Sequence, residues 1–253
     1  MEEFRKQIKR RTLVIPEDFP IESLRCYDFS PKYRVGREQD GGYVIAEGLD
    51  YDCFISAGVG DNISFELDFL NSNPPLECHL FDGHVKELPK PHPRIKFVPK
   101  NIAATMGSTT TNLHDLLNAH NNIFLKMDVE GGEFPFFSSL SRRHWLNIKQ
   151  LVVEIHQPFI AERWRHLETL TETHHLIHLH GNNAGKDPNI TFYGGITVPY
   201  TMEMTYLRKD ISPVAPSISP IPSPLDFPNI PSKKDIMLTG FPYNNLNPSW
   251  KTI

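Results

Sequence analysis

The stretch NIFLKMDVEGGEF, residues 122–134, joins an apolar run to three carboxylates and two adjacent glycines. Its first part, residues 123–127, is apolar except for one lysine, which is typical of a parallel strand covered on both faces. In an open α/β sheet, ligands bind outside the carboxyl ends of such strands. The stretch therefore predicts a central parallel strand with Asp128, Glu130 and Glu133 beyond its end, where active-site residues usually lie.

Six further apolar runs alternate with helical or loop segments along the chain. They lie at residues 52–60, 77–83, 94–99, 149–156, 175–181 and 196–208. Amphipathic helices are expected between them at residues 62–72, 109–120 and 162–174, where apolar residues recur at helical spacing. This alternation predicts an α/β fold with crossover connections, and seven strands fit one domain.

The chain has 253 residues, of which 39% are hydrophobic, so it is long enough for one sizeable core. We expect an N-terminal extension at residues 1–32, one domain at 33–210 and a tail at 211–253. The tail contains ISPVAPSISPIPSPLDFPNIP, which is too rich in proline for a helix or a central strand. Apolar residues such as Leu225 and Phe227 indicate that it packs on the domain instead of forming a free linker.

Charge and composition narrow the choice of partners. The formal net charge of −4 and the pI near 6.3 argue against a broad nucleic-acid surface, and the basic run at residues 5–11 is expected to be a solvated helix face. No apolar run reaches membrane-spanning length, so we expect a cytoplasmic protein without membrane or nucleic-acid partners. Cys26, Cys53 and Cys78 match neither zinc nor disulfide spacing and are expected in the core.

Two features predict an adenosine-containing cofactor. In FISAGVGDN, residues 54–62, a strand ends in Gly58-Val59-Gly60, which lets the backbone approach a ligand closely. Asp82 ends the next strand, 24 residues after Gly58, where a carboxylate can accept hydrogen bonds from the hydroxyls of a ribose. A lone G-x-G also serves plain turns, so the prediction rests on the pair of features.

The residues after the glycines favour S-adenosylmethionine over NAD. A dinucleotide fingerprint has a third glycine where this chain has Ile63. Asp61 would repel a pyrophosphate at the start of the following helix. S-adenosylmethionine has no phosphate and carries a sulfonium and an ammonium, so an acidic residue is compatible with it.

Several motifs together resemble one family. They are GREQDGGYVI, SAGVGDNISFE, LFDG, LKMDVEGGEF, VVEIH, HLHGNN and LDFPNIPSKKDI, spread over residues 33–240. The combination resembles the FkbM-type S-adenosylmethionine-dependent methyltransferases, with LKMDVEGGE as its most specific part. The resemblance implies the class I methyltransferase (Rossmann-like) fold, a mostly parallel seven-stranded α/β sheet that ends in an antiparallel hairpin and carries helices on both faces. It also implies O-methylation of sugars and other hydroxylated small molecules.

The resemblance also implies a set of cofactor-binding residues. Residues of the glycine loop would lie near the methionine and ribose parts of the cofactor. Residues that follow the second and third strands would lie near the ribose and the adenine. The DGGY stretch would either cap the cofactor or form a plain β-turn. The candidates are Gly42, Tyr43, Ser56, Gly58, Gly60, Asp61, Asp82, Gly83 and Asn101.

The candidate catalytic residues are Asp128, Glu154, His156 and His180, which end three successive strands. Methyl transfer to an alcohol is an in-line displacement, so the enzyme must align the reactants and remove the hydroxyl proton. Two mechanisms stay open. His156 is the base without a metal, or Mg²⁺ or Mn²⁺ held by Asp128 and Glu154 lowers the pKa of the hydroxyl. The metal-free base is preferred because no tight ligand cluster is visible.

Two charged residues in the first stretch have simpler explanations. Glu133 is expected to favour the start of a helix. Lys126, inside an apolar strand, is expected to be a paired structural charge whose partner is Asp128 or the cofactor carboxylate.

The leading hypothesis is an S-adenosylmethionine-dependent O-methyltransferase that acts on a hydroxyl of a sugar or glycoconjugate. One alternative is a methyltransferase-like module that has lost catalysis and serves as a binding scaffold. Retention of the residues proposed for cofactor binding and catalysis speaks against that loss. An NAD-linked oxidoreductase is a further alternative, disfavoured by Ile63.

Overall fold

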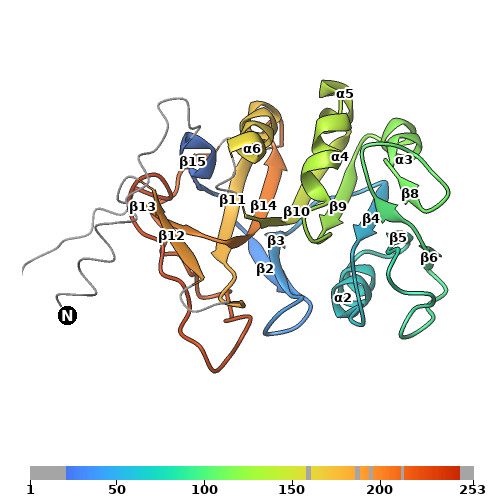
Figure 1. Ribbon diagram of the computed structural model, residues 1–253, viewed down its shortest axis with the longest axis horizontal. Coiled ribbons are helices and arrows are strands. Elements are labelled where there is room, and N and C mark those ends of the chain that lie inside the picture. Colours follow the sequence, from blue (N-terminus) through green and yellow to red (C-terminus); the bar gives the residue numbers. More distant parts are fainter. Residues whose placement is uncertain (1–20, 158–160, 186–188, 194–195, 212–213, 246–253) are drawn as a thin grey trace, which may run out of the picture.

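The computed structural model describes residues 21–157, 161–185, 189–193, 196–211 and 214–245. A seven-stranded sheet runs through its centre, with the strand order β11-β14-β10-β9-β4-β5-β6 (Figure 1). Its strands are β4 (Cys53–Ala57), β5 (Cys78–Phe81), β6 (Ile95–Val98), β9 (Ile123–Met127), β10 (Ile148–His156), β11 (His174–Gly181) and β14 (Thr201–Arg208). Only β14 is antiparallel to its neighbours in this sheet, which confirms the class I methyltransferase arrangement.

The direction of the chain through this sheet reverses at β4. From β4 the chain moves outward to β5 and β6, and it then returns to β9 on the other side of β4. The carboxyl ends of β4 and β9 therefore lie side by side at a topological switch point, where sheets of this class bind their ligands.

The side chains of β9 alternate between two buried faces. Ile123, Leu125 and Met127 pack on one face and Phe124 on the other, all 0% exposed. Helices cover the first face, on the upper side in Figure 1. They are α3 (His114–Ala119), α4 (Glu133–Ser139), α5 (Arg142–Asn147) and α6 (Ala161–Thr173). The prediction of a strand buried on both faces is confirmed.

Helix α2 (Ser64–Ser72) covers the second face with an aromatic cluster. Phe69 lies 4.2 Å from Phe124 and 4.6 Å from Phe54 between ring centroids, and Phe65 stacks beside it. This helix also buries Glu66, which the apolar spacing alone did not predict.

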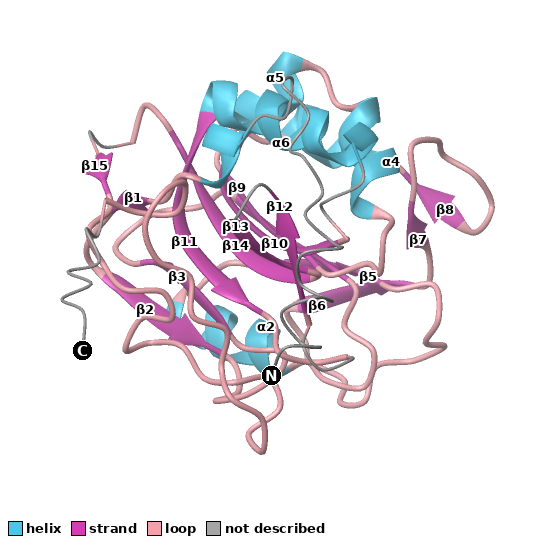
Figure 2. Ribbon diagram, turned by 60° about the vertical axis from the view of Figure 1, so that its left-hand side comes forward, coloured by secondary structure: helices cyan, strands magenta, loops and turns pink. Residues whose placement is uncertain are grey.

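A hairpin of β2 (Lys32–Val35) and β3 (Tyr43–Ala46) lies on the same face as α2, as Figure 2 shows. It is tied to the sheet by polar contacts. The hydroxyl of Thr205 donates to the carbonyl of Val44 at 2.6 Å, and the amide N–H of Ala46 donates to Gln150 at 3.2 Å. The loop of this hairpin reaches the carboxyl end of the sheet and contributes to the pocket described below.

The predicted strand at residues 196–208 is two strands. β13 (Ile196–Pro199) pairs with β12 (Ile190–Tyr193), and β14 begins after Tyr200. The predicted C-terminal antiparallel pair is β11 with β14. The remaining short elements are η1 (Ile21–Leu24), β1 (Tyr27–Asp28), β7 (Asn101–Ile102), β8 (Thr110–Thr111) and β15 (Ala215–Pro216).

The proline-rich segment at residues 214–245 lies against β11 and β14 through polar contacts, and its Ile221, Leu238 and Tyr243 join the main hydrophobic core. Asp226 accepts a hydrogen bond from His178 at 2.8 Å, and Asp235 lies 3.0 Å from His180. Asn229 donates to Glu203 of β14 at 2.5 Å. Within the described residues, no helix combines the length and apolarity needed to cross a bilayer. The basic run at residues 5–11 lies outside the described part.

Candidate active site

A pocket of about 440 Å³ lies at the switch point of the sheet, where β4, β5 and β9 end. Most of the predicted cofactor-binding residues line it. They are Gly58, Gly60, Asp61, Asp82 and Asn101. Asp128 and Glu130 line it from the end of β9, and Arg37 and Asp40 line it from the β2–β3 loop.

The two glycines after β4 serve different purposes. Both have positive φ, +76° at Gly58 and +51° at Gly60, which other residues rarely adopt. A Cβ at Gly58 would lie 1.6 Å from the carbonyl oxygen of Asp128, so Gly58 allows the ends of β4 and β9 to pack. A Cβ at Gly60 would meet only open space, so this glycine keeps the backbone exposed to the pocket.

Asp82 uses its carboxylate to hold the backbone of two loops. One oxygen accepts the N–H groups of Val59 and Gly60, both at 3.0 Å, and the other accepts those of His84 and Val85 at 2.7 and 3.3 Å. Burial alone would raise the pKa of Asp82, but the hydrogen bonds to its carboxylate have the larger effect. The pKa of Asp82 therefore lies below its usual range. Asp82 lines the pocket as predicted, yet its first role here is to shape the glycine loop.

Gly83 and Asn101 lie together beside Asp82. The N–H of Gly83 donates to Oδ1 of Asn101 at 3.2 Å, and a Cβ at Gly83 would lie 2.4 Å from that oxygen. Both residues are exposed, as is Asp61 on the other side of the pocket. Asp61 and Asn101 line the pocket, whereas Gly83 does not line it and contacts Asn101.

Three further predicted cofactor-binding residues do not line the pocket. Ser56 is 0% exposed and donates its hydroxyl to Glu66 at 2.6 Å, so it does not reach the pocket. Gly42 is buried behind the hairpin loop, where a Cβ would lie 1.9 Å from the carbonyl oxygen of Arg37. Tyr43 is 2% exposed and donates to Asp128 at 3.1 Å. DGGY is therefore a turn that shapes the pocket, and its first two residues, Asp40 and Gly41, line it.

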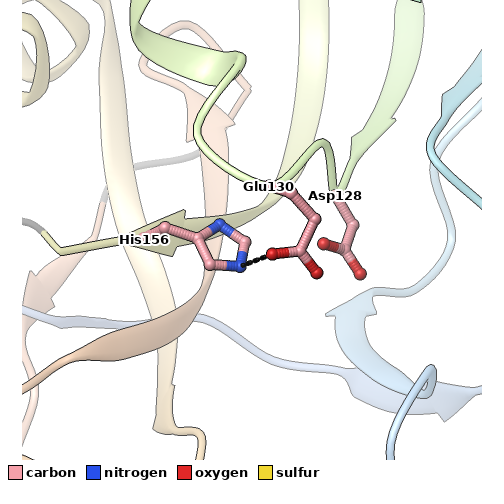
Figure 3. A group of neighbouring side chains, drawn as sticks. All are labelled: Asp128, Glu130 and His156. Carbon is pink, nitrogen blue, oxygen red and sulfur yellow. Dashed lines mark ion pairs between the residues drawn. The ribbon is translucent and has the colours of Figure 1, made fainter.

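Two candidate catalytic side chains, Asp128 and His156, converge with Glu130 beyond the ends of β9 and β10 (Figure 3). Asp128, Glu130 and His156 each offer one oxygen or nitrogen, and these atoms all lie within 4.8 Å of one another. Nε2 of His156 lies 3.3 Å from Glu130 and 3.1 Å from Glu154. Glu130 has a positive φ of 53°, a conformation that is uncommon for a glutamate and is found at functional sites.

Glu133 holds the other side of the His156 ring. It is 0% exposed at the start of α4, as expected for a residue that favours a helix start, and its Oε1 lies 3.3 Å from Nδ1 of His156. Burial alone would lower the pKa of His156, but the hydrogen bonds to Glu133 and Glu154 outweigh it and raise the pKa to about 10. The raised pKa favours the protonated imidazole at neutral pH, which disfavours His156 as the base.

The pKa values of two carboxyl groups near His156 are also raised above those of free acids. Burial raises the pKa of Asp128 more than the positive charges of Lys126 and His156 lower it. Burial, together with the negative charge of Asp128, raises the pKa of Glu154 to about 8. A carboxyl group whose pKa is raised towards neutrality is suited to accept a proton from a substrate.

A second group of carboxylates adjoins the first, and most of it was missed from the sequence. Asp40, Glu154 and Glu203 also place one oxygen each within 4.8 Å of one another. Glu203 lies directly opposite Glu154 in the β10–β14 register, and that pairing has no sequence signal. Asp128 and Glu154, which were predicted to share a cation, belong to different groups.

The structure contradicts a direct catalytic role for His180. This residue is 0% exposed, and its two ring nitrogens lie 2.9 Å from Glu203 and 3.0 Å from Asp235. Burial lowers the pKa of His180, but these two carboxylates outweigh it and raise the pKa to about 10. His180 therefore joins the proline-rich segment to the sheet.

This ion pair gives the fold a pH dependence. Since the pKa of His180 is raised from 6.5 to about 10 on folding, its contribution to stability is complete below pH 6.5 and is lost as the pH rises through about 10. We expect His180→Gln to lower the free energy of unfolding by about 3 kcal/mol at pH 6.5. Urea unfolding should show this difference from the wild-type protein shrink between pH 6.5 and 10. A difference that does not change with pH would contradict the ion pair.

Comparisons with known proteins give the family. The model of the methyltransferase FkbM domain matches residues 29–185, more than half of the chain. None of the curated protein sequences is similar enough to count as a match.

Similar solved structures are methyltransferases of low sequence identity. TrmN from Thermus thermophilus is 11% identical with a TM-score of 0.35 over 63% of this chain, which spans only 44% of TrmN. Precorrin-6y C5,15-methyltransferase from Geobacter metallireducens is 12% identical with a TM-score of 0.34, over 63% of this chain and 82% of that one. A putative methyltransferase from Thermoplasma acidophilum is 8% identical with a TM-score of 0.31, over 65% and 71%. By the match of its sequence to the family model, the chain belongs to the methyltransferase FkbM domain family.

Proposed function

We propose that the protein is an S-adenosylmethionine-dependent O-methyltransferase that acts on a hydroxyl of a sugar or glycoconjugate. The observation that carries the proposal is the position of Asp128. Its carboxylate lines the pocket beside the glycine loop, and its pKa is raised towards neutrality. Membership of the family implies the use of S-adenosylmethionine. The hydroxyl acceptor and the cytoplasmic location are proposed in addition.

The pocket residues fit S-adenosylmethionine. The open space over Gly60 allows close approach of a ligand to the backbone. The carboxylate of Asp61 lines the pocket and suits a ligand with a sulfonium and an ammonium. Asp61 and Ile63 also disfavour a pyrophosphate, as the sequence indicated.

Asp128 is the group that we propose takes the hydroxyl proton. When bound, S-adenosylmethionine supplies an electrophilic methyl group on sulfur, so the acceptor oxygen gains a methyl and loses a proton. Tyr43 donates a hydrogen bond to Asp128 at 3.1 Å and thereby fixes one of its oxygens. His156⁺, whose protonated form the buried Glu133 favours, stabilises the ionised form of Asp128.

A divalent cation is the alternative way to activate the hydroxyl. The atoms of Asp128, Glu130 and His156 are close enough to hold Mg²⁺ or Mn²⁺. We favour the metal-free base because Nε2 of His156 already lies 3.1 Å from Glu154 and 3.3 Å from Glu130. Full activity after dialysis against EDTA supports the metal-free base, and activity that returns only with added Mg²⁺ or Mn²⁺ overturns it.

The pH dependence of turnover tests the assignment of the base. Because Asp128 must be ionised and its pKa is raised, kcat/KM should rise with pH with an apparent pKa above about 4, the usual value of a carboxyl group. His156→Gln should move this rise to higher pH, since the imidazolium lowers the pKa of Asp128. A rate that is constant from pH 5 to 9 in both proteins would exclude a carboxylate base.

The acceptor class is tested by methyl transfer from S-adenosyl[methyl-³H]methionine to a panel of compounds. The panel should contain free sugars, glycosides, nucleic acids and proteins, with Asp128→Asn as the matched inactive control. Label that appears only on carbohydrate and stays through mild alkali, as an ether does, supports the proposal. Label on nucleic acid or protein nitrogen would contradict it, and no transfer to any compound would favour the scaffold alternative.

A further inference from the structure

Lys126 is a buried cation next to the pocket that the proposed proton transfer does not use. Its side chain is 5% exposed on β9, on the face of the sheet covered by α2. Its Nζ donates to the carbonyl of Gly58 at 3.0 Å and lies 3.4 Å from Oε1 of Glu66. The rings of Tyr43 and Phe65 lie 5.6 and 5.8 Å away. Lys126 therefore carries its charge among mostly apolar surroundings.

The described partners of Lys126 do not satisfy its ammonium fully. An ammonium has three N–H donors, and hydrogen bonds between opposite charges are usually about 2.7–2.9 Å long. The 3.4 Å to Glu66 is longer, and Oε1 of Glu66 already accepts the hydroxyl of Ser56 at 2.6 Å. Lys126 thus has capacity for a further, closer anionic partner.

The accessible part of Lys126 opens on the pocket, because the residue lines the pocket despite its burial. Its neighbours there are the first glycine of the loop, Gly58, and the base, Asp128. A ligand that binds against the glycine loop therefore presents its nearest groups to Lys126. Since the surroundings are poorly solvated, an anion at this position would be bound more strongly than at the surface.

We propose that Lys126 binds the α-carboxylate of the methionine part of S-adenosylmethionine, on the basis that this molecule is the cofactor as proposed above. That carboxylate is the only anionic group of the ligand. Lys126 is the most buried cation among the described residues that line the pocket, and the exposed carboxylate of Asp61 remains available to the ammonium. Lys126 would then select a ligand with an amino-acid end over an adenosine derivative without it.

The experiment compares two ligands on matched variants by titration calorimetry. The ligands are S-adenosylmethionine and decarboxylated S-adenosylmethionine, which keeps the sulfonium and the amine but lacks the carboxylate. The test variant is Glu66→Gln with Lys126→Met, so that no unpaired charge is left in the core. Glu66→Gln alone is the control that keeps Lys126, and Arg37→Met is the control for an exposed cation that lines the same pocket.

We expect the wild-type protein and both controls to bind S-adenosylmethionine about 10- to 100-fold more tightly than the decarboxylated ligand. This ratio of affinities is what one hydrogen bond to a charged group contributes to binding. The test variant should prefer it by less than about threefold. An equal loss of affinity for both ligands would show a purely structural role and overturn the proposal. So would a preference that disappears in Arg37→Met but not in the test variant.

The binding of the two ligands to the wild-type protein distinguishes a failure of the Lys126 proposal from a failure of the cofactor proposal. If the wild-type protein binds S-adenosylmethionine but shows no preference for it, the role of Lys126 is wrong while the cofactor stands. If it binds neither ligand, the cofactor assignment itself fails. Should the Met variant not fold, Lys126→Gln in the same Glu66→Gln background is read in the same way.

Discussion

Asp128→Asn should lower kcat by about 10²- to 10⁴-fold, the range over which a general base contributes, and leave the affinity for S-adenosylmethionine within about threefold. The substitution keeps the shape of the side chain and its hydrogen bond from Tyr43. It removes the capacity to take a proton. Initial rates and calorimetry on the same preparation separate the two effects.

Glu130→Gln is the matched control for this prediction. Glu130 lines the same pocket and lies 3.3 Å from His156, but its side chain is 84% exposed. We expect its kcat to fall by less than about tenfold. If Asp128→Asn turned over at the wild-type rate, or Glu130→Gln lost as much activity, Asp128 would not be the base.

Asp82→Ala should weaken the binding of S-adenosylmethionine by at least about 100-fold. The reason is the loss of the four backbone hydrogen bonds through which this carboxylate shapes the glycine loop and the start of the next loop. The free energy of unfolding should also fall by about 1–3 kcal/mol, because N–H groups are left without their acceptor. Calorimetry and urea unfolding measure the two effects.

Asp61→Ala is the control for Asp82→Ala. Asp61 lines the same pocket next to Gly60, but it is exposed. Its substitution should leave stability unchanged and weaken cofactor binding by less than about tenfold. Unchanged affinity in Asp82→Ala would show that the glycine loop keeps its shape without this carboxylate.

The sequence predicted the sheet well because its signals are local. The apolar run at β9 and the alternation of runs with amphipathic segments depend only on neighbouring residues. The split between β13 and β14 at Tyr200 was missed because the whole run 196–208 is strand-like. β13 pairs with β12, whereas β14 pairs with β10 and β11, and this change of partner depends on contacts between segments that are distant in the sequence.

The site was predicted less completely, because its chemistry depends on contacts between distant segments. Spacing along β4 and β5 was enough to find Gly58, Gly60 and Asp82. The charge of His156 depends on Glu133 from α4, and the second group of carboxylates includes Glu203, which only the register of β14 brings next to Glu154. Ser56 and His180 look like site residues by position, but each is enclosed by a partner, Glu66 and Asp235 respectively, that the local sequence does not reveal.

The central claim is that the pocket at the switch point of the sheet binds S-adenosylmethionine. Titration calorimetry of the purified protein with S-adenosylmethionine, S-adenosylhomocysteine and NAD tests it most directly. We predict micromolar binding of the first two and no binding of NAD. Binding of NAD, or no binding of any of the three, would contradict the claim.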